Sequence, residues 1–450
     1  MSDEVTAVLD TVRERVDPDA EERRQLQHVA ETVIERAESA IESHDLAADV
    51  MLVGSTARDT WIAGDRDIDV FVCFPPETDR ERLETLGLEI GHEVLPNGHE
   101  EYAEHPYVVG EVDGYDVDLV PCYAVEAATD IQSAVDRTPF HTQYLQSRLT
   151  DDLAADVRLC KAFLKGIGVY GSDLRTRGFS GYLTELLVLE YGGFRPLVEA
   201  AADWHPPVRF DPEAHGQATF DDPLVVIDPT DPERNVGAAL AKANVATFQH
   251  YARELLADPR ESLFESADPE PISPADVRYF FDRRGTTPIA ITLPTPDLVE
   301  DDLYPQLEKS LEGIVGLLDR RGFDVLRSEA FAGERVVLLA ELAVAERPAV
   351  ERHVGPPVHV RDHAEGFYES YHDTDAYGPF IHGDRYVVER ERDYRHADAL
   401  LRSEALFEVA LGTSIERALE DGYDILVGSD VANLATDFGQ ELAAYCAPKP

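Results

Sequence analysis

The stretch GSTARDTWIAGDRDIDVFV, residues 54–72, decides how this sequence is interpreted. It follows the apolar run VMLV, residues 50–53, which predicts a β-strand, and it leads into a second β-rich run, IDVFVCF. Side chains alternate between the two faces of a strand, so Asp67 and Asp69 project from one face while Ile68 and Val70 enter the core. The sequence therefore predicts two carboxylates side by side on a sheet.

Paired carboxylates of this kind favour a magnesium site. Mg²⁺ prefers hard oxygen ligands and is commonly held by one or two carboxylates together with water and substrate phosphates. A third carboxylate, Asp118, lies on the predicted strand YDVDLVPC, where Asp116 competes with it on the same face, and three carboxylates suit two-metal phosphoryl transfer. The DxD pattern alone is weak evidence, because in so acidic a chain it recurs at residues 17–19 and 373–375.

Gly54 and Ser55 supply the context that the aspartates need. They end the first predicted strand and open a turn and helix start, whose free backbone N–H groups can receive phosphate. Ser55 and Arg58 would then bind the triphosphate of a nucleotide. Taken separately, the Gly-Ser pair is a turn and Arg58 is a surface arginine, but the whole unit of strand, turn, arginine and DxD strand is far more specific.

The composition is strongly acidic. The 450 residues hold 89 Asp and Glu against 40 Lys and Arg, a formal net charge of -49, and only five of the basic residues are Lys. This balance would ordinarily argue against nucleic acid as a partner, because Lys and Arg bind phosphate. The acids are spread over the whole chain, however, which is typical of adaptation to molar salt, where charges are screened within about 3 Å. A very soluble acidic protein is the alternative, so charge leaves the partner undecided.

Cysteine usage and hydropathy exclude several classes of protein. Four cysteines stand far apart without a CxxC pair, which argues against a zinc ribbon or a disulfide framework and favours free buried thiols. The N-terminus is acidic and amphipathic rather than signal-like, and no window approaches about 18 uninterrupted apolar residues. We therefore expect a cytoplasmic protein with no membrane partner.

The chain length and pattern predict a multidomain α+β protein. Strands and helices mix in residues 1–140, an α/β domain, and apolar residues at helical spacing make residues 141–265 a helical domain. A stretch rich in Pro and acid, ADPEPISPAD, marks the boundary that follows. A β-α-β-β pattern and then shorter strands and helices predict an α+β region over residues 266–450.

Residues 54–72 are similar to the signature of the DNA-polymerase-β-like nucleotidyltransferases, in which the Gly-Ser pair and DxD act together on nucleotide and metal. Seven further segments, in order and over nearly the whole chain, resemble the archaeal, class I tRNA CCA-adding enzymes: EYAEHPYV, DVDLVPCY, RTPFHTQYL, RLCKAFLKGIGVYGSD, GFSGYLTELL, DPTDPERNV and GPFIHGDRYVVE. The resemblance implies a template-independent enzyme that completes or repairs the 3′ CCA end of tRNA from CTP and ATP. It also implies a two-metal mechanism with Mg²⁺, and a homodimer.

The resemblance assigns roles to single residues of the first domain. Asp67, Asp69 and Asp118 match the catalytic metal carboxylates, and Ser55 and Arg58 match contacts to the nucleotide phosphates. In this interpretation the first domain performs the chemistry, the helical domain completes the nucleotide pocket and the C-terminal region binds tRNA.

Residues further along the chain complete the predicted site. His141, Lys161 and Tyr170 match positions that reach the nucleotide, and their types suit phosphate contact; their structural alternatives are a satisfied helix-start histidine, a solvated helix face and an aromatic plug. Arg234 matches the residue that reads the incoming base, with a surface arginine as the alternative. Tyr102 matches a contact to the end of the tRNA primer, with a loop aromatic as the alternative.

Two other functions stay open. One is a different enzyme of the same superfamily, such as a poly(A)-adding or small-molecule nucleotidyltransferase, which gives no reason for the long C-terminal half. The other is a non-catalytic RNA-binding protein descended from such an enzyme, which is disfavoured because all three aspartates are present.

Overall fold

The computed structural model describes residues 2–216, 218–266 and 268–450. The chain forms two compact units, Met1–Ala267 and Asp268–Lys449. The division between them falls in the stretch rich in Pro and acid that the sequence indicates as a boundary. The further division of the first unit at residue 140 stays a prediction.

A five-stranded mixed sheet lies in the first unit. Its order is β1-β2-β5-β4-β3, with β2 and β5 parallel and the other neighbours antiparallel. The strands are β1 (Asp49–Leu52), β2 (Asp67–Phe74), β3 (His99–Tyr102), β4 (Pro106–Val112) and β5 (Tyr115–Tyr123). The predicted mixed sheet is confirmed, and the short edge strand β3 is an addition to it.

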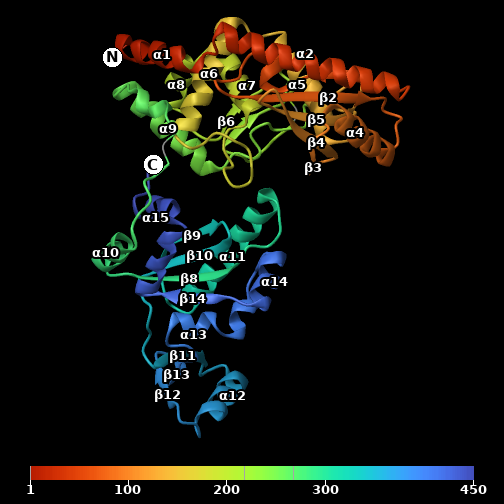
Figure 1. Ribbon diagram of the computed structural model, residues 1–450. Helices are drawn as coiled ribbons and strands as arrows, with labels where there is room; N and C mark the ends of the chain where they lie inside the picture. The colour runs from red at the N-terminus through yellow and green to blue at the C-terminus, as the bar shows by residue number, and fades with distance from the viewer. Residues whose placement is uncertain (1, 217, 267) are drawn as a thin grey trace. The chain divides into compact units, whose positions relative to one another are not determined.

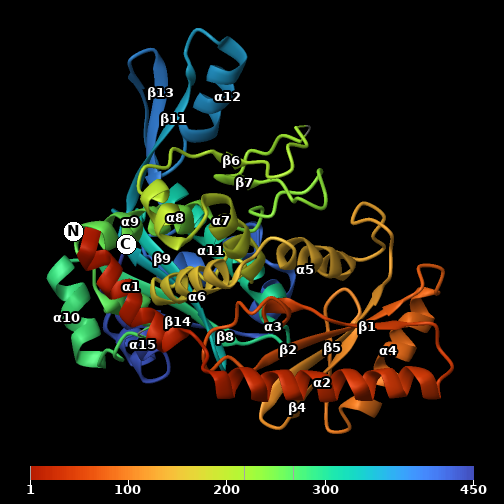
Figure 2. The same cartoon turned by 90° about the horizontal axis from the view of Figure 1, so that it is seen from above.

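Two helices, α2 (Ala20–Ser43) and α4 (Arg80–Val94), pack on one face of this sheet (Figures 1 and 2). Ile68 and Val70 of β2 are 1% and 0% exposed and belong to the core under these helices, as the alternation predicts. Asp69 lies between them in the strand, so its side chain points to the opposite face.

One of the recurring DxD patterns is structural. Asp19 begins α2 by accepting hydrogen bonds from the backbone N–H groups of Glu21 and Glu22, and Asp17 accepts one from Arg158 at 2.6 Å. Helix capping by Asp stabilises a helix start without any ligand. Residues 17–19 are thus explained by the fold.

Helices form most of the remaining first unit. They are α1 (Ser2–Val16), α3 (Gly54–Ala57), α5 (Thr138–Gln146), α6 (Asp151–Gly166), α7 (Gly181–Tyr191), α8 (Phe194–Ala201) and α9 (Lys242–Ala257), with the 3₁₀ turns η1 (Ala134–Arg137) and η2 (Glu261–Phe264). All but α3 and η1 contribute to one apolar core, in which Phe163 meets Phe194 and Phe248 edge to face and to which α5 contributes Leu145. A short parallel pair, β6 (Val208–Phe210) and β7 (Leu224–Val226), interrupts the helices and was not predicted.

The second unit contains two antiparallel sheets with the orders β14-β8-β10-β9 and β11-β13-β12. Its elements are α10 (Pro274–Arg284), β8 (Thr287–Pro294), α11 (Glu300–Arg320), β9 (Val325–Ala332), β10 (Arg335–Leu342), β11 (Val350–Pro357), α12 (Arg361–Tyr371), β12 (Tyr377–His382), β13 (Arg385–Glu391), α13 (Ala397–Leu401), η3 (Glu404–Glu408), α14 (Thr413–Asp421), β14 (Asp424–Val427), η4 (Gly428–Thr436) and α15 (Gly439–Cys446). The predicted β-α-β-β pattern and the α+β fold class are confirmed.

Strand β10 explains why its sequence is apolar without alternation. Val336 and Leu338 lie in the core on the α11 side, whereas Val337 and Leu339 lie in the core on the α10 and α15 side. A strand that is covered on both faces buries consecutive side chains. None of the helices in the described residues is long and apolar enough to span a bilayer.

Candidate active site

The parallel pairing of β2 and β5 sets carboxylates side by side. Asp67 pairs with Asp116, and Asp69 pairs with Asp118, in one continuous register. Directly paired residues on neighbouring strands point to the same face, so all four lie on the face opposite α2 and α4. The structure thus brings the three predicted aspartates together and keeps Asp116 beside them; we call these four residues the carboxylate face.

Burial and mutual repulsion act on the carboxylate face. Burial raises the pKa of Asp118 to about 6, and the charge of Asp69 adds to the shift. Burial also raises the pKa of Asp69, against the attraction of Arg58, and raises the pKa of Asp67, where Asp65 adds to the effect. Crowded carboxylates favour the protonated form unless a cation neutralises them. This face is therefore suited to a cation.

The turn after β1 lies against the carboxylate face. Helix α3 begins at Gly54, whose φ is +70°, and a Cβ placed on Gly54 would overlap the Asp69 carboxylate. The Val53 N–H donates to the Asp69 carbonyl at 3.0 Å, and Thr56 Oγ1 donates to the Asp67 carbonyl at 2.7 Å. Only glycine meets both demands at position 54. Ser55 follows in the same turn and is half-buried.

Magnesium fits the chemistry of this face. Carboxylates are the hard oxygen donors that Mg²⁺ prefers, and the missing side chain at Gly54 leaves room for the Asp69 carboxylate. Within the described residues, no group of three or more His, Cys, Asp or Glu side chains is arranged so that it could hold a metal ion by itself. Protein sites for Mg²⁺ are commonly incomplete in this way, because the ion keeps several waters and takes phosphate oxygens from the substrate.

Arg58 and Lys161 converge on one buried carboxylate, Glu185 of α7. Arg58 Nε donates to Glu185 Oε2 at 2.9 Å, and Lys161 Nζ lies 3.6 Å from Oε1. Thr60 joins them, because its hydroxyl donates to Glu185 and its carbonyl accepts from Lys161 Nζ at 2.9 Å. The side chains of Arg58 and Lys161 are only 8% and 4% exposed. The alternatives of a surface arginine and a solvated lysine are therefore wrong.

This buried cluster links the turn at Gly54 to helices α6 and α7. Burial lowers the pKa of Lys161, and the charge of Glu185 opposes that effect. Arg58 also donates from Nη1 to Thr142 of α5 at 3.1 Å. The positive charge of Arg58 opposes the rise that burial causes in the pKa of Asp69, and it adds to the lowering that burial causes in the pKa of His141. Arg58 therefore acts electrostatically on the carboxylate face and on the α5 side of the site together.

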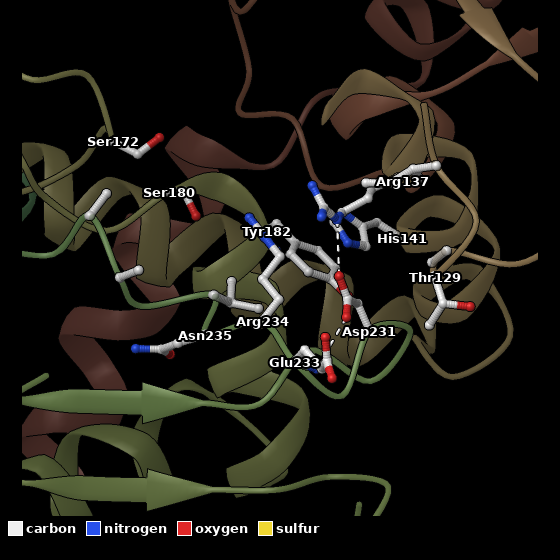
Figure 3. A pocket seen from close by; sticks show the side chains of 15 residues that line it. Thr129, Arg137, His141, Ser172, Ser180, Tyr182, Asp231, Glu233, Arg234 and Asn235 are labelled. Carbon is white, nitrogen blue, oxygen red and sulfur yellow. Dashed lines mark hydrogen bonds and ion pairs between the residues drawn. The ribbon is translucent and has the colours of Figure 1, made fainter. Parts of the chain in front are cut away.

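A pocket of about 830 Å³ lies beside α5 and α7 (Figure 3). Its lining includes His141 and Arg234, two of the predicted residues, together with Arg137, Tyr182 and Asp231. A volume of this size suits a nucleotide-sized ligand. The four residues of the carboxylate face do not line it, so the pocket and the carboxylate face are separate features of the first unit.

His141 and Arg234 meet at Asp228. His141 Nε2 lies 2.8 Å from Asp228 Oδ2, and Arg234 Nη1 donates to the same oxygen at 2.7 Å. The His141 ring stacks on Tyr182 with a centroid distance of 3.8 Å and an angle of 14°. Burial lowers the pKa of His141, against the effect of Asp228. The His141 side chain therefore has a polar partner within the fold, and it also lines the pocket.

The two predicted tyrosines do not line this pocket. Tyr170 pairs through its backbone with Phe179, and Lys165 Nζ lies 5.5 Å from the centre of its ring. Tyr170 packs against the apolar core after the end of α6, as the aromatic-plug alternative holds, and burial raises its pKa. Tyr102 is the last residue of β3 rather than a loop residue, and its side chain is 72% exposed.

Two acidic residues central to this geometry, Glu185 and Asp228, were missed from the sequence. Both are 0% exposed. Asp228 opens the motif DPTDPERNV, and Glu185 stands within the otherwise apolar run LTELLVL. An acid inside an apolar helical run was the available signal for Glu185, because such an acid is buried only when it is paired.

Three family models match successive parts of the chain. The nucleotidyltransferase domain matches residues 34–141, the second domain of tRNA nucleotidyltransferase matches residues 155–265, and the C-terminal domain of the CCA-adding enzyme matches residues 284–428. The CCA-adding enzyme of Haloarcula marismortui is 64% identical over 466 residues, which cover 100% of each chain. The chain belongs to the CCA-adding enzyme family.

Other CCA-adding enzymes match over similar lengths. That of Halobacterium salinarum is 61% identical and covers 99% of each chain, and that of Methanoregula boonei is 46% identical and covers 92% of this chain and 90% of its own. The predicted family and enzyme class, a tRNA nucleotidyltransferase, are confirmed. Matches over the full length disfavour both alternative functions. The haloarchaeal sources of two relatives agree with the interpretation of the acidic charge as adaptation to molar salt.

Proposed function

We propose that this chain completes or repairs the 3′-terminal CCA of tRNA from CTP and ATP, without a nucleic acid template and with release of pyrophosphate. The observation that carries the proposal is the register of β2 and β5, which sets Asp69 beside Asp118 against the turn at Gly54. Membership of the CCA-adding enzyme family supplies the identity of the substrates.

Asp67, Asp69 and Asp118 would hold two Mg²⁺ ions. Bound magnesium supplies positive charge that acidifies the attacking 3′-hydroxyl and neutralises the triphosphate. The 3′ oxygen of the tRNA then forms a bond to the α-phosphorus of the nucleotide while the bond to the β-phosphate oxygen breaks, and pyrophosphate leaves. No covalent enzyme intermediate is needed. The part of the three aspartates is to concentrate negative charge where the cations are required.

The proposed nucleotide contacts rest on the family resemblance together with the positions of the residues. Ser55 and Arg58 would contact the triphosphate, since both belong to the turn against Asp69. His141 and Arg234 would contact the nucleotide from the wall of the pocket. Lys161 already donates to Thr60, so we infer that it supports the turn that carries Ser55 and Arg58.

Tyr170 would be a further nucleotide contact, and this assignment rests on the family resemblance alone. Tyr102 would stack on the end of the tRNA primer, for which its exposed ring at the end of β3 is available. We also propose a homodimer and a cytoplasmic location, both from the family.

The second unit would bind the tRNA. Exposed arginines and tyrosines lie among acidic residues on β11–β13 and α12, namely Arg352, Arg361, Arg385, Tyr368 and Tyr377. Arginine binds phosphate and tyrosine stacks on bases. These side chains can contact RNA, and membership of the CCA-adding enzyme family supports tRNA as the partner.

A direct test uses the purified protein in molar KCl with MgCl₂, CTP, ATP and tRNA that lacks its 3′ CCA. Sequencing of the product ends should show growth by CCA that stops there. Excess EDTA and the variant Asp69→Asn should each abolish the addition. An unbounded homopolymer would indicate a different enzyme of the superfamily, and no addition by the wild-type protein would refute the proposal.

A further inference from the structure

Asp228 begins a tightly closed loop that forms one wall of the pocket. The Asp228 N–H donates to the Arg234 carbonyl at 3.0 Å, and the Arg234 N–H donates to the Asp231 carbonyl at 3.1 Å. Below the loop, the Val236 N–H donates to the Val226 carbonyl at 2.8 Å. The backbone therefore fixes where the Arg234 side chain leaves the loop. Figure 3 shows Arg234 and Asp231 beside Tyr182, His141 and Arg137 at the pocket.

The two oxygens of Asp228 have different partners. Oδ1 accepts from the backbone N–H of Thr230 at 2.9 Å and from its hydroxyl at 2.8 Å, so it closes the loop. Oδ2 lies 2.8 Å from His141 Nε2 and accepts from Arg234 Nη1, so it joins the loop to α5. One oxygen thus serves the fold of the loop, and the other holds two side chains that line the pocket.

The partners of Asp228 also determine its ionisation. Burial alone would raise its pKa, but the hydrogen bonds from His141 and Thr230 and the charge of His141 hold the pKa well below its ordinary value. An ionised carboxylate can only accept hydrogen bonds. His141 must therefore carry a proton on Nε2, and in the neutral ring Nδ1 is left as an acceptor.

Tyr182 restrains the same histidine from a third element. Its ring stacks on His141, and its hydroxyl donates to Asp228 Oδ1 at 3.4 Å. The orientation of the His141 ring is thus set by α5, by α7 and by the loop at Asp228. A ring held on three sides keeps one orientation when a ligand enters.

We propose that Asp228 is a positioning residue that couples His141 to Arg234 and fixes the Nε2–H form of His141, so that both side chains meet the incoming nucleotide in one arrangement. The inference rests on the proposed function, because it takes CTP and ATP as the ligands. Asp228 acts through its two partners and needs no contact of its own with the nucleotide.

The substitution Asp228→Asn separates the two roles of the carboxylate. The amide oxygen can take the place of Oδ1 and keep the loop closed, while the amide nitrogen replaces Oδ2 and meets two donors. The Arg234 guanidinium cannot accept a hydrogen bond, so its link is lost. His141 can accept at Nε2 only by moving its proton to Nδ1. The variant should therefore release Arg234 and switch the tautomer of His141.

Two measurements test this in molar KCl. Nitrogen NMR of ¹⁵N-histidine-labelled protein, with the His141 signal assigned by its absence in His141→Gln, should show Nε2–H in the wild type and Nδ1–H in Asp228→Asn. The KM for CTP and for ATP should rise by roughly tenfold or more in Asp228→Asn, since a charged hydrogen bond is lost, with a smaller change in kcat.

Asp231→Asn is the matched control for the NMR signal. Asp231 has the same design in the same loop: Oδ1 accepts from the Glu233 N–H at 3.1 Å, while Oδ2 accepts from Arg137 Nε at 3.2 Å. Its substitution should leave the His141 tautomer unchanged. A switch of the tautomer in both variants would show a general disturbance of the loop and overturn the inference.

Other outcomes would also overturn the inference about Asp228. An Nδ1–H signal in the wild type would overturn the inference, even if Asp228→Asn failed to fold. Unchanged KM values in a folded Asp228→Asn would overturn it too. If the wild-type protein bound CTP in a calorimetric titration but added nothing to tRNA, the proposed function would fail. The tautomer of His141 would still test the positioning role of Asp228.

Discussion

Gly54 lies directly against the Asp69 carboxylate, which has room there because glycine has no side chain. A Cβ placed on Gly54 would overlap the Asp69 carboxylate, and the backbone at Gly54 has a φ of +70°. The Val53 N–H, one residue earlier, donates to the Asp69 carbonyl. The turn and the strand therefore hold each other in place through their backbones, and the carboxylate fills the gap that glycine leaves.

Gly54→Ala should reduce nucleotide addition by about 100-fold or more, because displacement of a metal carboxylate by about 1 Å is enough for such a loss. The matched control is Gly64→Ala. Gly64 has a φ of +87°, but no described atom lies within 4 Å of its added Cβ. Both variants should lose about 1 kcal/mol of stability from the left-handed backbone, and only the Gly54 variant should lose activity. Equal activities would contradict the role given to Gly54.

Asp118→Asn should stabilise the metal-free protein at pH 7.5 while it abolishes addition. The folded-state pKa of Asp118 is about 6 and its ordinary value is 3.8. Ionisation of a carboxyl with a raised pKa opposes folding, so wild-type stability falls as the pH rises between these values. At pH 7.5 the variant should gain about 1 kcal/mol, after allowance for solvent screening. Thermal unfolding in EDTA measures this gain.

The same experiment at pH 4.5 is the control, because Asp118 is then largely protonated in the folded protein and the variant should gain much less. Mg²⁺ should raise the unfolding temperature of the wild type at pH 7.5 and act less on Asp118→Asn. A variant that is less stable than the wild type in EDTA at pH 7.5 would show that the buried, ionised Asp118 carboxylate does not oppose folding.

Glu185→Gln should destabilise the first unit by about 3 kcal/mol, because it leaves Arg58 and Lys161 buried beside a neutral amide. Trp61 and Trp204, the two tryptophans of the chain, both lie buried in this unit, so their fluorescence in a urea titration follows it. Glu190→Gln, an exposed position on the same helix, should change stability by less than about 0.5 kcal/mol. Equal effects of the two substitutions would argue against the buried cluster.

Stability and addition should both increase with KCl concentration, because screening reduces the self-repulsion of a chain with a formal net charge of -49. The unfolding temperature can be measured between about 0.1 M and about 3 M KCl, with the Debye length falling to about 3 Å near 1 M. Sucrose at matched osmolality provides the control for solvent exclusion. A protein that is fully stable and active at low salt would favour the alternative of a merely soluble acidic protein.

The sequence predicted those features that depend only on residues close together in the chain. Alternation along residues 67–70 was enough to place Asp67 and Asp69 on one face, and the Gly-Ser pair was enough to mark the turn beside them. The pairing of Asp69 with Asp118 depends on which strands become neighbours, and that choice is made by the packing of the whole sheet. Lys161 carried a partial signal, since lysine is rare in this chain, but its burial follows from contacts with Thr60 and Glu185 far away in sequence.

Asp228 shows why the rest could not be predicted. Asp228 opens the family-like segment DPTDPERNV, but the sequence gives no sign that the folded loop brings this acid to His141, a residue 87 positions earlier. Periodicity describes which face of an element is buried, and it does not describe which polar groups of distant elements satisfy one another. The positioning residues of this site are therefore visible only in three dimensions.

The alignment of β2 with β5 has a consequence for errors in folding. A slip of one residue would set Asp69 opposite Val117 and would turn alternate side chains of one strand over, burying carboxylates among the apolar residues under α2 and α4. A chain misassembled in this way would lose its core together with the carboxylate face. Molecules that are folded but misaligned and inactive should accordingly be rare, because the arrangement that makes the protein work is the one that makes it stable.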